Sequence, residues 1–272
     1  GSGGEPIELR EMKKDVEGTW TYVKSGDLHG VYYTYLVTHA ERIRETGDPY
    51  AKAAGVNGER SMVVDLERTN PQGFKKDRGP RFVKWTDAII YELSIADTTA
   101  DISCGAKHAG KYLGLTECGT KNEAGLSTGL DHIIESGVTH VQIMPFYDFG
   151  SVDEADVDRE QYNWGYDPVN YNVPEGSYST DPFHGEVRIQ ELKQMIQSFH
   201  QNGIGVIMDV VYNHTYDVEG NMTSTLDIAG SIDINAKVEG EMSFTNAIRQ
   251  NGADPWIFYH DGYFYYTASE AR

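Results

Sequence analysis

The strongest constraint on the fold is a regular alternation of apolar strand patterns and amphipathic helix patterns in the middle of the chain. Gly137 and the pair Asn202-Gly203 end the two helix patterns, as glycines commonly do. Strand, helix and strand joined by short connections predict parallel β/α units. The sequence therefore predicts an α/β fold with three parallel strands, where a closed (β/α)8 barrel has eight. The five patterns occupy residues 88–93, 129–136, 138–145, about 185–201 and 204–211.

The flanking residues have different patterns. Residues 18–37 contain two strand-like runs separated by Ser25-Gly26-Asp27, which predicts a β-hairpin, and residues 61–66 predict one more short strand. Residues 221–239 alternate Thr, Ser, Ile and Asp without a helical period. Residues 251–267 predict two strands around an Asp-Gly turn. The opening residues 1–4 are typical of an added linker and carry no information about the fold.

Composition narrows the function classes. The 272 residues are 39% hydrophobic and 24% charged, which is typical of a globular protein with one barrel or two smaller domains. The net charge of −19 repels phosphate backbones and argues against a nucleic-acid partner. No apolar run is long enough to predict a membrane span. The 18 tyrosines suit a neutral sugar, although most of them are equally well explained as half-buried strand residues.

The two cysteines, Cys104 and Cys118, predict neither a metal site nor a disulfide framework. No signal peptide is visible. The sequence leaves localisation open between a cytoplasmic protein and a secreted one whose leader has been removed.

Two segments carry candidate functional residues. The first, residues 162–168, is an aromatic and amide cluster bounded by Gly165 and Pro168, which predicts a rigid loop. The second places Asp209 in the third strand pattern and His214 just beyond it. The carboxyl ends of parallel barrel strands are where such folds hold their sites. The alternative is that Asp209 is a solvated strand end and His214 an ordinary loop residue.

Both segments resemble motifs of type I pullulanases, the α-1,6-debranching members of the α-amylase superfamily. The resemblance covers about residues 5–217 and includes the patterns at 110–117, 127–132 and 146–154. It implies that residues 71–217 form the N-terminal part of a (β/α)8 TIM barrel. Residues 5–70 would then be the end of a glycogen-binding-type β-sandwich and a linker, and residues 218–272 a β-rich tail.

The resemblance also implies roles for individual residues in a retaining hydrolase of α-1,6 bonds in pullulan, glycogen or starch. Tyr166 would be the aromatic platform for the reacting ring, with Asp167 beside it. Asp209 would orient an arginine of the nucleophile strand, and His214 would hydrogen-bond a sugar hydroxyl. Asn163 and Trp164 would shape the loop or a subsite.

The sequence departs from the pullulanase pattern in ways that limit these expectations. The first strand reads Tyr91-Glu92-Leu93-Ser94-Ile95-Ala96-Asp97, without the usual His and Arg. The patterns that supply the nucleophile and the acid, which a retaining glycosidase holds roughly 5–5.5 Å apart, do not follow. The alternative is therefore a catalytically incomplete fragment or chimera that at most binds α-glucan. Another chain, or the residues from Val218 onward, would have to cover the open barrel edge.

No cofactor is expected. Asn213 lies where some members of the superfamily bind calcium, but one oxygen ligand is far short of the six to eight that Ca²⁺ takes. The sequence therefore supports no metal site.

A second resemblance concerns residues 244–269. The motif Ala253-Asp254-Pro255-Trp256 resembles the first blade of five-bladed propeller arabinanases and β-xylosidases. In that family the equivalent of Asp254 is the catalytic base, so a further alternative is a fragment of an enzyme acting on arabinan or xylan.

Overall fold

The computed structural model describes residues 8–15, 20–39, 42–81, 83–156, 159, 161–217, 252–260 and 263–270. The segment 221–239, for which the sequence predicts alternating polar and apolar residues, lies outside the described residues. Among the described residues, no helix has the length and apolar character needed to cross a membrane. Cys104 and Cys118 are free thiols, the first buried and the second exposed.

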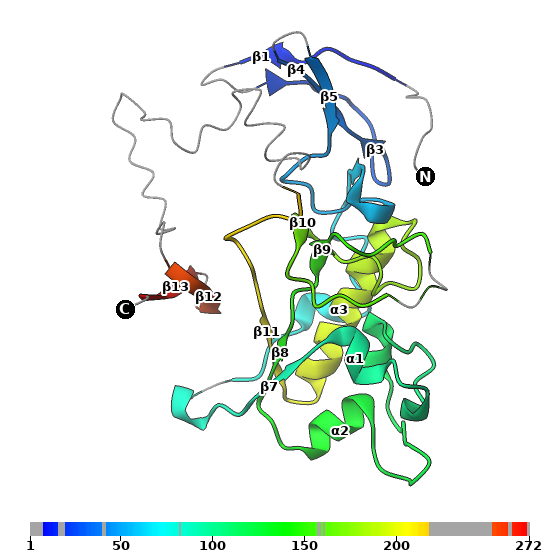
Figure 1. The fold of residues 1–272 in the computed structure, drawn as a ribbon, viewed down its shortest axis with the longest axis vertical. Helices are drawn as coiled ribbons and strands as arrows, with labels where there is room; N and C mark the ends of the chain where they lie inside the picture. Colours follow the sequence, from blue (N-terminus) through cyan, green and yellow to red (C-terminus); the bar gives the residue numbers. More distant parts are fainter. Residues whose placement is uncertain are drawn as a thin grey trace.

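A three-stranded parallel sheet forms the centre of the α/β region. Its strands are β7 (Ile90–Leu93), β8 (His140–Ile143) and β11 (Gly205–Met208), in the order β11-β8-β7. Helices α1 (Ile95–Thr99), α2 (Gly129–Glu135) and α3 (Gly185–Gln201) lie on one side of this sheet (Figure 1). The alternation of strands and helices predicted from the sequence is confirmed. The boundaries differ mainly in that each strand is shorter than the segment predicted for it.

The main core lies between this sheet and its helices. Apolar residues of α3 recur at helical spacing, so one face of the helix packs inward while the other meets solvent. Val141 and Ile143 of β8 point into the same core, which leaves Gln142 half-buried on the other face of the sheet. The fully or almost fully buried members include Ile95, Tyr112, Leu115, Leu130, Ile133, Val141, Ile143, Met195 and Phe199.

A second pair of strands follows β8. Strand β9 (Tyr147–Phe149) pairs antiparallel with β10 (Pro168–Pro174), and the register shifts twice along the pair. Pro168, which the sequence predicts as the end of a loop, is the first residue of β10. That is one of the few strand positions where proline, which lacks a backbone N–H, is tolerated. The loop before Pro168 is thereby attached directly to a strand.

The N-terminal pairing differs from the predicted hairpin. The two runs within residues 18–37 do not pair with each other. Each instead has a partner elsewhere. The backbone of Gly30 and Val31 at the start of the second run is hydrogen-bonded to Val63, so this run pairs with residues later in the chain. The antiparallel pairs are β1 (Lys13–Lys14) with β2 (Trp20–Thr21), β3 (Tyr32–Tyr33) with β6 (Ser61–Met62), and β4 (Tyr35–His39) with β5 (Arg42–Thr46).

Near the C-terminus, β12 (Gly252–His260) pairs antiparallel with β13 (Tyr263–Glu270). The two strands predicted around the Asp-Gly turn are confirmed. Asp254 lies in β12 at an irregularity in the register between Ala253 and Trp256.

Candidate functional site

Asp209 lies at the carboxyl edge of the parallel sheet. It directly follows β11, and its backbone N–H donates to the carbonyl oxygen of Ile143, the last residue of β8, at 3.0 Å. This hydrogen bond continues the ladder by one step and fixes where the chain leaves the sheet. The side chain therefore starts from a rigid position at the edge where α/β barrels hold their sites.

The structure brings Tyr166, Asp209 and His214 together. The hydroxyl of Tyr166 donates to Oδ2 of Asp209 at 2.7 Å. Nε2 of His214 lies 2.5 Å from the carbonyl oxygen of Tyr166. Because a carbonyl oxygen only accepts, this nitrogen carries the proton. Tyr166 and Asp209 are half-buried and His214 is exposed, so the group faces solvent without being detached from the protein.

The loop that carries Tyr166 is held by its own side chains. Nδ2 of Asn163 donates to Oδ1 of Asp167 at 2.9 Å and to the carbonyl oxygen of Gly150 at 3.2 Å, while its Oδ1 accepts from the N–H of Gly165 at 2.8 Å. Gly165 has φ +86°, and a Cβ there would lie 2.3 Å from the carbonyl oxygen of Pro145. Asn163 and Gly165 therefore shape the loop that presents Tyr166.

Asp167 and Trp164 occupy different environments. Oδ2 of Asp167 is a buried atom that accepts no hydrogen bond from the described residues. Trp164 is 52% exposed, its ring meets that of Tyr162 edge-on at 5.9 Å, and its Nε1 donates to the Tyr162 hydroxyl. Trp164 thus exposes an aromatic surface on the loop, whereas the side chain of Asp167 is turned inward.

Two tyrosines that the sequence did not single out support the segment after β11. The hydroxyl of Tyr147 accepts from the N–H of Val211 at 2.9 Å, and the hydroxyl of Tyr171 donates to the carbonyl oxygen of His214 at 2.7 Å. Their ring centroids lie 5.8 Å apart, and Tyr171 also contacts the ring of Tyr212 at 5.5 Å. Burial raises the pKa of Tyr171 to about 12, so its hydroxyl stays protonated and able to donate at neutral pH.

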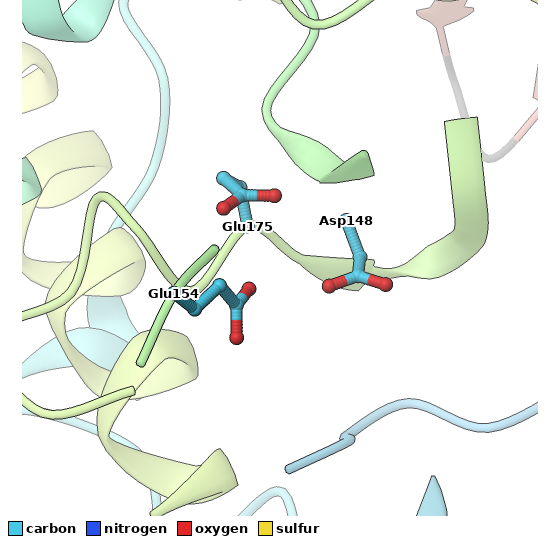
Figure 2. A group of neighbouring side chains, drawn as sticks. All are labelled: Asp148, Glu154 and Glu175. Carbon is cyan, nitrogen blue, oxygen red and sulfur yellow. The ribbon is translucent and has the colours of Figure 1, made fainter. Parts of the chain in front are cut away.

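A network of buried charged groups lies where β9, the end of β10 and α3 meet, and the sequence did not predict it. Figure 2 shows Asp148 of β9, Glu154 of the following loop and Glu175 just after β10 as neighbouring side chains. One carboxylate oxygen of each lies within 4.8 Å of the others, and all three residues are buried. They are the one group of three potential metal ligands that the described part of the chain provides.

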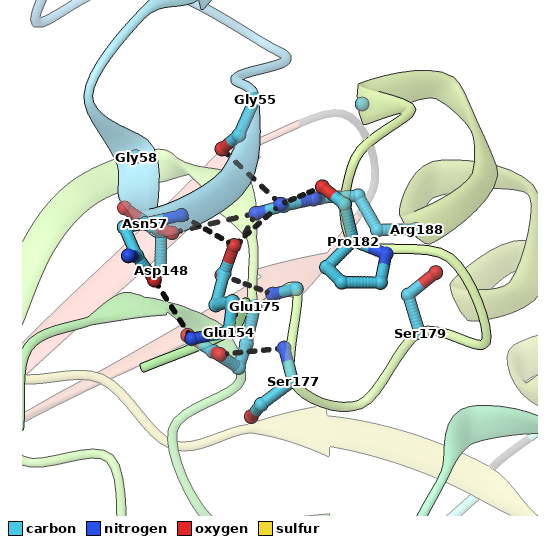
Figure 3. A network of polar contacts seen from close by, with 12 residues as sticks. Gly55, Asn57, Gly58, Asp148, Glu154, Glu175, Ser177, Ser179, Pro182 and Arg188 are labelled. Carbon is cyan, nitrogen blue, oxygen red and sulfur yellow. Dashed lines mark hydrogen bonds and ion pairs between the residues drawn. The ribbon is translucent and has the colours of Figure 1, made fainter. Parts of the chain in front are cut away.

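Arg188 of α3 supplies the positive charge in this network. Its Nη2 lies 2.8 Å from Oε2 of Glu154, and its Nη1 lies 3.4 Å from Oδ1 of Asp148, with all three side chains almost completely buried (Figure 3). The same guanidinium donates to the carbonyl oxygens of Gly55, Pro174 and Pro182. Arg188 therefore ties α3 to the N-terminal segment and to the end of β10.

Every carboxylate oxygen in the network already accepts a hydrogen bond. The donors other than Arg188 are the side-chain amide of Asn170 and the backbone N–H groups of Asn57, Phe149, Gly176 and Ser177. A cation would have to displace these donors, and a guanidinium already provides the counter-charge. The network fits a structural ion pair and not a metal centre. Asn213, the residue considered for calcium, is exposed and outside it.

Three carboxyl groups around one guanidinium leave an excess of negative charge. Burial and the neighbouring Glu154 raise the pKa of Asp148 to about 8. Burial, Glu154 and Asp148 raise the pKa of Glu175 well above its ordinary value. The fold therefore favours the neutral, protonated forms of these two acids.

Residues 89–234, more than half of the chain, match the family model "Alpha amylase, catalytic domain". The chain belongs to the alpha-amylase family. Its parallel β/α units are accordingly units of a (β/α)8 TIM-barrel fold, and members of this family are hydrolases that need no organic cofactor.

Within the alpha-amylase family, the similar proteins include several pullulanases. The pullulanase of Bacillus subtilis is 39% identical over 228 residues, which cover 80% of this chain and 29% of that protein. The solved apo pullulanase from Paenibacillus barengoltzii is 51% identical with a TM-score of 0.81, covering 84% of this chain and 35% of the other. The pullulanase from Bacillus acidopullulyticus is 46% identical with a TM-score of 0.78, covering 83% and 27%. The chain thus spans about a third of the length of these relatives.

The Paenibacillus barengoltzii pullulanase has also been solved as a complex with maltohexaose and α-cyclodextrin, and as a variant with maltotetraose. These complexes identify α-glucan chains as ligands of that relative.

Proposed function

We propose that this chain is the substrate-holding part of a pullulanase-type glycoside hydrolase, and that the full-length protein cleaves α-1,6 bonds of pullulan or branched α-glucan with retention. The observation that carries the proposal is the cluster of Tyr166, Asp209 and His214 at the carboxyl edge of the parallel strands. The similarity to several pullulanases supports the same substrate class. In this role the Tyr166 ring lies under the C–H face of a glucose unit, and Asp209 and His214 face its polar groups.

The direct test measures maltotriose released from pullulan by the full-length protein. Tyr166→Ala and Asp209→Ala are expected to abolish release because each removes half of the Tyr166–Asp209 contact and one contact to the sugar. Tyr50→Ala is the matched control, since Tyr50 is 75% exposed in the N-terminal region. Unchanged release by both site variants would contradict the proposal.

A second candidate is that these 272 residues alone bind α-glucan without cleaving it. What supports it is the sequence itself, in which no nucleophile pattern follows Asp217. Maltotetraose binding without any reducing sugar from pullulan is the expected result. Robust turnover by the chain alone would exclude it.

We also propose that residues 5–70 are the end of a glycogen-binding-type β-sandwich with its linker. The short antiparallel pairs in the N-terminal region support this. For residues 244–269, the antiparallel pair β12/β13 supports the propeller-blade proposal, with Asp254 as a candidate base. Release of sugar from linear arabinan or xylan, lost on Asp254→Asn, is what this role requires.

A further inference from the structure

We propose that Tyr171 and Tyr147 are positioning residues that set the orientation of His214 and the course of the segment that follows Asp209. The proposal rests on the proposed function for its consequence in sugar binding, but its structural part stands on the contacts below. Neither tyrosine belongs to the cluster of Tyr166, Asp209 and His214, so each acts through the residues that it holds.

The segment from Asp209 to His214 lacks support from regular structure. Strand β11 ends at Met208, and the residues up to Asp217 form neither strand nor helix. Backbone groups outside a ladder need partners from elsewhere. After the Asp209–Ile143 hydrogen bond, the side chains of Tyr147 and Tyr171 provide such partners, at Val211 N–H and at the His214 carbonyl.

The two tyrosines lie on paired strands, Tyr147 buried and Tyr171 half-buried. Tyr147 is 1% exposed on β9, and Tyr171 lies on β10, the antiparallel partner of β9. Their rings are in contact at 5.8 Å between centroids. A hydroxyl at the end of a packed ring orders its partner at little cost in side-chain entropy, because a tyrosine has few rotatable bonds.

His214 is held from two sides by one continuous stretch of chain. Its carbonyl oxygen accepts from the hydroxyl of Tyr171, and its ring nitrogen donates to the carbonyl oxygen of Tyr166. The Tyr166 loop leads directly into β10, so the Tyr171 hydroxyl and the Tyr166 carbonyl that hold His214 belong to one continuous stretch of chain. Removing the Tyr171 hydroxyl frees the His214 backbone and loosens the ring, although the Tyr166 carbonyl remains in place.

The matched variants remove one hydroxyl each and keep the ring. Tyr171→Phe and Tyr147→Phe test the proposal, and Tyr33→Phe is the control. The Tyr33 hydroxyl also makes a part-buried hydrogen bond, to Asp48 at 2.6 Å, but its partner belongs to the N-terminal region. Thermal unfolding of all three variants reports whether the fold is kept.

The first readout is nitrogen NMR of ¹⁵N-histidine-labelled chain, which separates the two imidazole tautomers. In wild type, the His214 signals should be those of the Nε2-protonated tautomer. In Tyr171→Phe they should move toward the averaged values of a free imidazole, and in Tyr147→Phe they should shift less. Tyr33→Phe should leave them unchanged. His214 signals in Tyr171→Phe that match wild type would overturn the proposal.

The second readout is maltotetraose affinity by calorimetry. Loss of one positioning hydrogen bond should weaken binding by on the order of 3- to 10-fold in Tyr171→Phe, with no change in Tyr33→Phe. Full affinity in Tyr171→Phe would overturn the positioning role in sugar binding. If wild type does not bind maltotetraose while the His214 signals still respond, the proposed function fails and the structural part of the inference stands.

Discussion

At the scale of single residues, Gly165 is the position where a side chain has no room. Gly165→Ala should lower the free energy of unfolding by about 2–5 kcal/mol. A positive φ costs a non-glycine residue about 1–2 kcal/mol, and the overlap of its Cβ with the Pro145 carbonyl adds a packing cost of about 1–3 kcal/mol. Urea unfolding measures the change.

Gly203→Ala is the matched control for Gly165→Ala. Gly203 also has a positive φ, +74°, but a Cβ there meets nothing within 4 Å. Gly203→Ala should therefore lower the free energy of unfolding only by the backbone strain, about 1–2 kcal/mol. Equal costs at the two positions would mean that the Tyr166 loop moves away from Pro145 without penalty.

Tyr166 makes the contact on which the candidate site depends most. Tyr166→Phe keeps the aromatic ring and removes only the hydroxyl that donates to Asp209. A hydrogen bond to a charged group contributes about 1.5–3 kcal/mol, so maltotetraose affinity should fall by roughly 10- to 100-fold. Calorimetry against Tyr50→Phe checks this, and an unchanged affinity would show that only the ring of Tyr166 matters.

The sequence singled out Tyr166, Asp209 and His214 but not the side chains that hold them. The resemblance to pullulanase motifs drew attention to these three residues, because loop and strand-end patterns alone fit a solvated strand end equally well. The structure places the three together, and their role in binding sugar stays a prediction. Tyr147 and Tyr171 were not singled out, since a tyrosine within a strand pattern is equally typical of packing. What distinguishes these two tyrosines is that the hydroxyl of each bonds to a backbone group far away in the sequence. A local sequence pattern cannot reveal such a partner.

At the scale of elements, the buried network of Asp148, Glu154, Glu175 and Arg188 joins β9, β10 and α3. It was not predictable, because acidic residues are usually solvated and the four residues come from separate elements and loops that no local pattern links. The pairing of β3 with β6 was missed for a related reason. The β4/β5 hairpin lies between them, and pairing across an intervening element has no local signal. The parallel strands, by contrast, carry local signals: β11 has a continuous apolar run, and β8 has apolar residues at alternate positions.

The network predicts an unusual pH dependence of stability. Asp148 has a pKa of about 8 in the fold against an ordinary value of 3.8, so between these values the folded state keeps a proton that the unfolded state has released. Its contribution is therefore fully present below pH 4 and is lost as the pH rises through about 8. The wild-type unfolding free energy minus that of Asp148→Asn should fall from pH 4 to pH 8, as measured by urea unfolding.

Asp153→Asn provides a control of opposite sign. Asp153 is exposed, and hydrogen bonds from Asn57 and Ala155 lower its pKa, so its contribution is present above pH 4 and lost as the pH falls. The wild-type value minus that of Asp153→Asn should not decrease between pH 4 and pH 8. Parallel curves for wild type and Asp148→Asn would mean that Asp148 is ionised in the fold across this range.

At the scale of the whole molecule, the parallel sheet has two open edges among the described residues. Strand β8 lies in the centre, and β7 and β11 each pair on one side only. In a closed (β/α)8 barrel both edges pair with further strands. Ile89, Ile90 and Tyr91, at and beside the start of β7, are exposed. An apolar strand edge of this kind is a template for pairing with another chain.

These edges predict concentration-dependent association of the 272-residue chain. The net charge of −19 opposes it, so raising the salt concentration should strengthen association by screening the repulsion between chains. Ile90→Lys should shift the chain toward monomer, because Ile90 is 49% exposed in β7 and a charged residue blocks edge-to-edge pairing. Ile43→Lys, at a 68% exposed position in β5, should leave association unchanged. Sedimentation velocity distinguishes the species. A wild-type chain that stays monomeric at high concentration and high salt would show that its own residues cover the edges. If Ile90→Lys and Ile43→Lys had equal effects, the added charge alone, and not the β7 edge, would control association.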